Sequence, residues 1–284
     1  EDEGCLLDEV RLSWKKLMQK VAGAKYRTLY QQESANPEDV LVSETWLTGG
    51  VDVEGYPALG CYDHERGFWE WPAGRCVTYA CVDPSASKFW AIEVWALKLE
   101  TGERFLVYGE RRKMQAGTSK GFLDWDATAL KHVGLMEELQ TKVGELGHVL
   151  ALWIVEANAA HRYLLQTNAY DTWRRKWPNV KVIPHQTQKN KQDENYGVFA
   201  ALSQPYKEGK KRLPRKKGDL RALTYLHVKE AELTKYPFHP TDDTVMADWF
   251  GEMRLTYIQG LARKLEQWDD TGDIPLKNYL AEAS

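Results

Sequence analysis

Two short apolar runs, each followed by an acidic residue, dominate the pattern of hydrophobic and polar positions. The first run, 76–82, leads into Asp83, and the second, 149–155, leads into Glu156. Both runs lack charge and are rich in β-branched or aromatic residues, so each predicts a buried β-strand. A carboxylate at the last position of a buried strand is held rigidly. We therefore expect two fixed carboxylates at the edge of one sheet.

The rest of the pattern predicts alternating strands and helices. Further strands are expected at 88–99, 104–111 and 180–183, and a short Gly-bearing turn joins the first two as a hairpin. Helices are expected, from apolar residues at three- and four-residue steps, at 5–22, 126–146, 159–176, 193–203, 219–235 and 242–267. This order implies an α/β fold, with a mixed sheet that carries helices on its faces.

Composition sets the size and class of the protein. The chain has 284 residues, 43% hydrophobic and 28% charged, which is typical of a soluble globular protein with one sizeable core. No apolar run approaches the ~20 residues of a membrane span, and the acidic start is unlike a signal peptide. Residues 49–75 are rich in Gly, Pro and acidic residues and predict a loop. Because the chain begins without Met, we expect a piece of a longer polypeptide or a processed product.

The cysteines indicate a reducing compartment. Cys5, Cys61, Cys76 and Cys81 form no Cys-x-x-Cys pair, so a zinc site is not expected. Cys76 and Cys81 are expected to be reduced thiols in the core, which suits the cytoplasm.

The charge balance excludes a protein that coats DNA by charge alone. The net charge is −3 and the isoelectric point is about 6.2. One segment, 207–217, is nevertheless basic: it holds Lys207, Lys210, Lys211, Arg212, Arg215, Lys216 and Lys217. With its glycine and proline it could be a projecting hairpin that neutralises DNA phosphates, or simply a solvated loop. Arg111-Arg112-Lys113 and Arg174-Arg175-Lys176 are lesser candidates for DNA contact.

A pair of acids, Asp242 and Asp243, precedes the last predicted helix. Aspartate is favoured at a helix N-cap, so we expect one of the pair to cap the helix and the other to bind a metal, with Asp243 the better ligand. Asp248 points ~120–140° away from both on a helix, so it should face solvent or a neighbouring helix. Asp83 could simply start a turn. Asn158, just after Glu156, could orient a ligand or cap the helix at 159–176, and capping is favoured.

The order Asp, Glu, Asp resembles that of the ribonuclease H-like nucleases and Holliday-junction resolvases. The flanking residues resemble the C-terminal nuclease domain of tailed-phage large terminase subunits, over roughly 76–260 and more weakly over 26–50. The segments that carry this resemblance are Val82-Asp83-Pro84-Ser85, Val155-Glu156-Ala157-Asn158, Lys189-Asn190-Lys191 with 199–214, and 241–248. One departure concerns His239. In the family the closing motif is often His-Asp-Asp, whereas here two residues separate His239 from the Asp pair.

The resemblance implies a domain organisation, an activity and a set of partners. Residues 1–75 would be a linker from the end of an upstream ATPase domain, and 76–284 a ribonuclease H-like nuclease domain with helices on both faces of its sheet. It would cut double-stranded viral DNA with little sequence specificity during genome packaging, in the host cytoplasm. The small terminase subunit and the portal protein would be partners of the full-length protein.

The resemblance also implies a two-metal centre. Asp83, Glu156, Asp242 and Asp243 would hold two Mg²⁺ or Mn²⁺ ions, since all the ligands are oxygen. Asp83, Glu156 and Asp243 would be catalytic, with one ion activating a water and the other stabilising the leaving 3′ oxygen. A lysine near this centre is expected at Lys191 or Lys189, and Lys191 joins the expected DNA contacts.

Two other functions stay open. A resolvase-like or repair nuclease of the same fold would need a dimer and structure-specific binding. A non-catalytic DNA-docking module would use its acids only to cap helices. The chain contains no Gly-x-x-x-x-Gly-Lys-Ser/Thr loop, so we do not expect it to hydrolyse ATP.

Overall fold

The structure is a computed structural model that describes residues 40–51, 55, 57–85, 89–115, 124–187 and 190–270. The helix expected at 5–22, most of the linker, Cys5 and Lys189 lie outside these residues.

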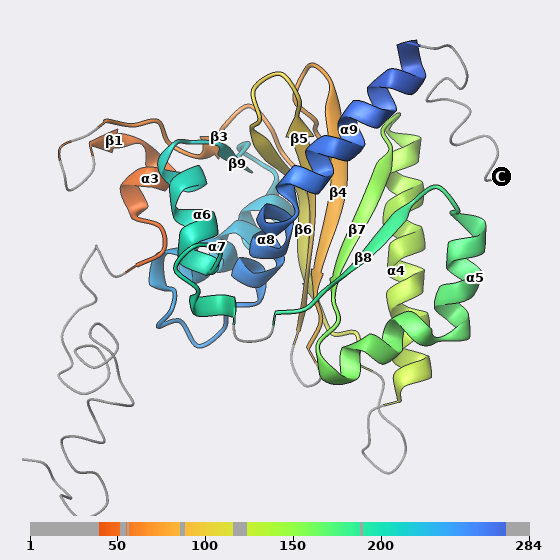
Figure 1. Cartoon of the computed structure of the whole chain (residues 1–284). Coiled ribbons are helices and arrows are strands. Elements are labelled where there is room, and N and C mark those ends of the chain that lie inside the picture. The colour runs from red at the N-terminus through yellow and green to blue at the C-terminus, as the bar shows by residue number, and fades with distance from the viewer. Residues whose placement is uncertain are drawn as a thin grey trace, which may run out of the picture.

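One mixed sheet of seven strands forms the centre of the described part of the chain (Figure 1). Its order is β3-β9-β6-β5-β4-β7-β8. The strands are β3 (Tyr62–Asp63), β4 (Cys76–Asp83), β5 (Trp90–Lys98), β6 (Arg104–Arg112), β7 (Leu150–Glu156), β8 (Lys181–His185) and β9 (Lys211–Pro214). Strand β5 runs antiparallel to both of its neighbours, β4 and β6, whereas β7 and β8 continue parallel to β4. The mixed sheet that the sequence predicted is confirmed.

Helices cover both faces of this sheet (Figure 1). On one face lie α4 (Trp125–Glu145), the 3-10 helix η2 (Ala159–Gln166) and α5 (Asn168–Lys176). On the other lie α6 (Val198–Lys207), α7 (Leu220–Lys235), α8 (Asp243–Met253) and α9 (Leu255–Asp270). The helix expected at 242–267 is therefore two helices, divided at Arg254. The shorter elements are α3 (Glu44–Thr48), β1 (Gly50–Val51), β2 (Pro57–Ala58) and η3 (Asn190–Gln192).

Strand alternation decides which face each side chain joins. In β4, Val77, Tyr79 and Cys81 belong to the core under α8, whereas Ala80 and Val82 belong to the core under α4. Because successive side chains point to opposite faces, Asp83 continues the series that faces α8. The tryptophans expected in the core, Trp90, Trp95, Trp153 and Trp249, are all buried.

Described residues before 76 pack into the same core as the residues that follow them. Leu41, Leu47 and Cys61 are buried against α6 and α8 residues, and β3 pairs with β9 inside the main sheet. The division at residue 75 into a linker segment and a nuclease domain stays a prediction.

The described thiols agree in part with the sequence prediction. Cys61 and Cys81 are free and buried, while Cys76 is free and only half-buried. Among the helices of the described chain, none is both long and apolar enough to cross a membrane.

Candidate functional site

Asp83 and Glu156 end neighbouring parallel strands at the centre of the sheet. Val82 pairs with Val155, so the two acids that follow lie at the same edge, about 4.8 Å apart in strand spacing. Glu156 alternates with Ile154 of the core under α8, so both carboxylates face that helix. The two carboxylates that the apolar runs predicted are thus brought together.

Helix α8 adds the Asp pair to the same edge. It begins at Asp243 and packs over β4 and β5. Gly251, two turns along, lets it lie close to the sheet, because a Cβ there would come within 2.9 Å of the Tyr79 ring and 3.1 Å of Cys81 Sγ. We call Asp83, Glu156, Asp242 and Asp243 the acidic edge.

The electrostatics show that these four acids interact. Asp83 is half-buried, and burial raises its pKa well above the ordinary carboxyl value. The nearby carboxylates of Glu156, Asp243 and Asp242 raise the pKa further, and Lys191 opposes them. A proton or a cation is therefore favoured among the acids of this edge.

Glu156 is held by its neighbours. It is 8% exposed and accepts hydrogen bonds from Asn158 Nδ2 at 2.8 Å and from Thr187 Oγ1. Asn158 Oδ1 in turn accepts the Thr187 N–H at 3.0 Å. The favoured capping role of Asn158 is wrong, because its side chain makes no cap bond to η2. It bonds to Glu156 instead, in line with the alternative that it orients a ligand.

Two cations contact the Asp pair. Arg111 Nη2 donates to Asp243 Oδ2 at 2.6 Å, and Lys191 Nζ lies 3.3 Å from Asp242 Oδ2. Burial raises the pKa of Asp243, against the lowering effect of Arg111. The hairpin register places Arg111 here, since it pairs with Ala91, which pairs with Asp83. That register could have identified Arg111 from the sequence, whereas Thr187 gave no signal.

The acidic edge fits a hard divalent cation in its chemistry but is not a ready-made cage. Its donors are all carboxylate oxygens, which suits Mg²⁺ or Mn²⁺. Burial and then repulsion among the carboxylates raise the pKa of Asp83, and a bound cation would relieve that repulsion. Among the described residues, however, no three His, Cys, Asp or Glu side chains converge closely enough to hold a metal ion. Arg111 and Lys191 balance part of the negative charge instead.

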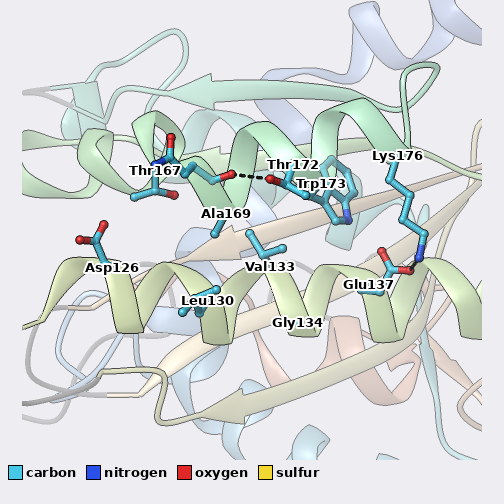
Figure 2. A pocket seen from close by; sticks show the side chains of 11 residues that line it. Asp126, Leu130, Val133, Gly134, Glu137, Thr167, Ala169, Thr172, Trp173 and Lys176 are labelled. Atoms are coloured by element: carbon cyan, nitrogen blue, oxygen red, sulfur yellow. Dashed lines mark hydrogen bonds and ion pairs between the residues drawn. The ribbon is translucent and has the colours of Figure 1, made fainter.

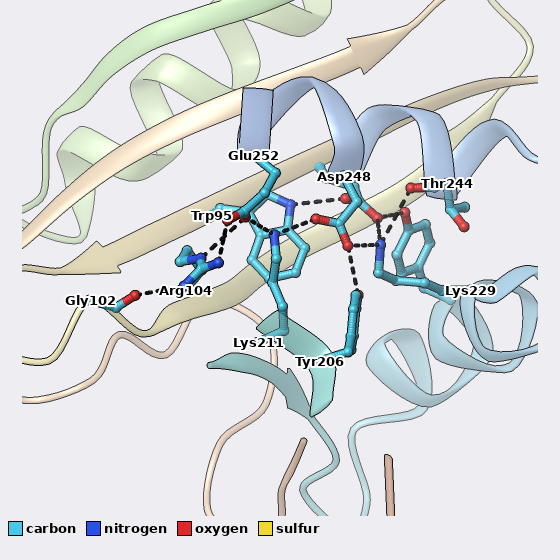
Figure 3. Close-up of polar contacts among 11 residues, drawn as sticks. Trp95, Gly102, Arg104, Tyr206, Lys211, Lys229, Thr244, Asp248 and Glu252 are labelled. Carbon is cyan, nitrogen blue, oxygen red and sulfur yellow. Dashed lines mark hydrogen bonds and ion pairs between the residues drawn. The ribbon is translucent and has the colours of Figure 1, made fainter. Parts of the chain in front are cut away.

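Asp248 lies apart from the acidic edge, in a buried network (Figure 3). It is fully buried, accepts from Tyr206 Oη at 2.6 Å and Lys211 Nζ at 2.5 Å, and pairs with Lys229 at 3.2 Å. The expectation that it could face solvent is wrong, and it points to its neighbouring elements instead.

The basic segment 207–217 is not a projecting hairpin. Its centre is β9, and Lys211 is fully buried because Asp248 and Glu252, at 2.5 and 2.9 Å, neutralise it inside the core. The prediction that Lys211 contacts DNA is therefore wrong. Lys211 lies beside Arg104, which comes seven residues before Arg111 on β6.

The other members of the segment are wholly or partly exposed, and several have partners. Lys216 pairs with Glu70 at 2.6 Å, Arg215 pairs with Glu230, and Lys217 is exposed. Lys210 Nζ donates to Thr101 O at 3.2 Å, Arg212 Nη1 donates to Gly60 O at 3.0 Å, and Lys207 Nζ lies 5.7 Å from the Trp46 ring centre.

Two of the grooves on the described surface bear on the basic residues. One, of about 640 Å³, runs between α7 and the end of β6, where Arg111, Arg112 and Arg221 line it. The other, of about 660 Å³, lies between α4 and α5 (Figure 2). It contains Lys176, paired with Glu137, and lies over the face opposite the acidic edge.

The chain is similar in structure to nucleases of known structure, at low sequence identity. The large terminase nuclease of thermophilic phage G20c, with bound zinc, is 16% identical, with 62% of this chain and 81% of that one covered and a TM-score of 0.36. A large terminase from another thermophilic bacteriophage is 14% identical, with 64% and 40% covered and a TM-score of 0.40. The yeast mitochondrial Holliday junction resolvase Ydc2 is 10% identical, with 68% and 86% covered and a TM-score of 0.37. No protein-family model and no curated protein matches the chain.

Proposed function

We propose that this chain is a metal-dependent endonuclease that cuts double-stranded DNA during phage genome packaging. The observation that carries the proposal is the position of Asp83. It ends the central strand β4, and burial, together with the nearby carboxylates of Glu156, Asp243 and Asp242, raises its pKa. Clustered carboxylates of this kind suit divalent cations that act on phosphodiesters.

Each residue of the acidic edge has a distinct role in this proposal. Asp83, Glu156, Asp242 and Asp243 would hold Mg²⁺ or Mn²⁺, which when bound supply activation of water and stabilisation of the leaving oxygen. Asn158 and Thr187 fix the direction of Glu156. Arg111 and Lys191 offset negative charge beside the site and could contact a phosphate once a cation takes over that task.

The DNA would lie along a basic fringe that differs from segment 207–217. The fringe consists of Arg111, Arg112, Lys113, Lys191 and Arg221, which border the acidic edge or the groove beside it. The exposed Phe89 ring lies under two of these cations, with Arg111 Cζ at 5.4 Å and Lys113 Nζ at 5.3 Å from its centre. Such contacts would grip phosphates without reading the sequence.

The small terminase subunit and the portal protein are the proposed partners.

The test is cleavage of supercoiled plasmid with and without Mn²⁺. We expect metal-dependent nicking and linearisation by the parent chain, loss of both in Asp83→Asn, and full activity in Asp126→Asn, which changes an acid on α4. Binding of DNA without cleavage would instead indicate a docking module. Strong preference for a four-way junction over linear duplex would indicate a resolvase-like nuclease.

A further inference from the structure

The first turn of α8 is capped by another helix. Asp242 occupies the N-cap position, yet its side chain makes no cap hydrogen bond. The backbone N–H of Thr244, which an N-cap side chain would ordinarily accept, donates instead to Glu232 Oε2 at 2.7 Å. The prediction that one Asp of the pair caps the helix is therefore wrong.

Glu232 makes three hydrogen bonds to the segment that carries the Asp pair. Besides the Thr244 N–H, it accepts from Thr244 Oγ1 at 2.6 Å and from Thr241 Oγ1 at 2.6 Å. These donors flank Asp242 and Asp243 on both sides. Glu232 is fully buried on α7, and its carboxylate lies at the positive end of the α8 dipole.

A second buried side chain of α7 holds the same turn. Lys229 Nζ donates to the Thr244 carbonyl at 3.4 Å and pairs with Glu93 of β5 at 2.7 Å (Figure 3). It also pairs with Asp248 one turn along α8. Helix α7 thus joins the first turn of α8 to the sheet through side chains that solvent does not reach.

This arrangement leaves the Asp pair free for other contacts. An Asp242 side chain that capped its own helix would be turned back toward the Thr244 N–H. Because Glu232 takes that bond, Asp242 reaches Lys191 and Asp243 reaches Arg111, and both raise the pKa of Asp83.

We infer that Glu232 is a positioning residue, which caps α8 from α7 so that Asp242 and Asp243 face Asp83 and Glu156 as metal ligands. This inference rests on the proposed function. Groups that orient metal ligands from behind typically contribute 10–100-fold to metal affinity, and Glu232 acts on two ligands at once.

The experiment is a calorimetric titration of Mn²⁺ into the full chain, at a temperature where each variant is folded. Glu232→Ala should weaken Mn²⁺ binding about 10–100-fold. Glu232→Gln should recover most of the loss, because the amide oxygen can still accept the Thr244 N–H. Thr241→Val removes one bond beside Asp242 and should weaken binding by a smaller factor. The matched control is Thr234→Val, since Thr234 Oγ1 bonds only within α7, to Glu230 O, and its loss should leave Mn²⁺ affinity unchanged.

The outcomes separate the two proposals. If the parent binds Mn²⁺ and cleaves DNA while Glu232→Ala binds Mn²⁺ equally well, the positioning role is wrong and the nuclease proposal stands. If Glu232→Ala does not fold, the comparison of Thr241→Val with the control Thr234→Val decides. Equal Mn²⁺ affinity in Thr241→Val and Thr234→Val then overturns the positioning role. If the parent binds no Mn²⁺, the proposed function fails and the positioning role fails with it.

Discussion

The folded protein disfavours ionisation of Asp83 in the acidic edge. The carboxyl pKa of Asp83 is raised in the folded protein by burial and by three neighbouring carboxylates. The folded chain therefore holds this proton more tightly than the unfolded chain does. Below the ordinary carboxyl pKa of 3.8 the effect on stability is absent. As the pH rises from there through the folded pKa, ionisation of Asp83 increasingly destabilises the metal-free protein.

Asp83→Asn should therefore stabilise the metal-free protein at neutral pH while abolishing cleavage. Thermal unfolding in EDTA should show a higher Tm for the variant at pH 8 and little difference near pH 4. Added Mn²⁺ should raise the Tm of the parent and not that of the variant, because ligand binding to the folded state stabilises it. A lower Tm of the variant at pH 8 would show that the attraction of Lys191 outweighs the repulsion from the carboxylates and would contradict the prediction.

At the scale of elements, the close approach of α8 to β4 fixes the acidic edge. Gly251→Ala would place a methyl group 2.9 Å from the buried Tyr79 ring and 3.1 Å from Cys81 Sγ. Overpacking of this kind typically costs about 1–3 kcal/mol, more than the helix gains from alanine. We expect a lower unfolding free energy in urea and weaker Mn²⁺ binding.

The matched control is Gly134→Ala in α4, where nothing lies within 4 Å of the new methyl group. It should be neutral or stabilise the protein by up to about 1 kcal/mol. Equal effects at the two glycines would argue against close packing of α8 as the determinant.

Elements with strong periodicity were predictable from the sequence, and so was the meeting of Asp83 with Glu156. The apolar runs place both acids at strand ends, and this placement can be predicted from the neighbouring residues in the sequence alone. Strand β9 was not predictable, because a lysine run suggests a solvated loop. Lys211 is buried only because Asp248 and Glu252, distant in sequence, neutralise it. The cap of α8 was missed for the same reason, since Glu232 comes from another helix.

At the scale of the whole molecule, the distribution of basic side chains around the acidic edge should set the salt dependence of DNA binding. Changing Arg112, Lys113 and Arg221 to Ala should make the log–log salt plot shallower by up to about 3 units, because each lost phosphate contact removes about 0.9. Affinity should fall about equally for all duplex sequences. The measurement is fluorescence anisotropy over a range of NaCl concentrations.

The matched triple variant changes Lys210, Lys216 and Lys217, from the segment that the sequence favoured. Its slope should stay within error of the parent. A shallower slope in this variant and an unchanged slope in the first would return DNA contact to segment 207–217.

The rate at which Cys81 is alkylated should report how often α8 separates from the sheet. The Cys81 thiol is fully buried beneath Gly251, and burial raises its pKa well above the ordinary value, so iodoacetamide should reach and react with it only after the helix lifts. Mass spectrometry can follow alkylation of Cys81 against the half-buried Cys76 in the same molecule. Mn²⁺ should slow alkylation of Cys81 and leave Cys76 unaffected, because an ion held by the acidic edge would tie the helix to the strands. Equal alkylation rates at Cys81 and Cys76 would mean that α8 is not held against the sheet at the acidic edge.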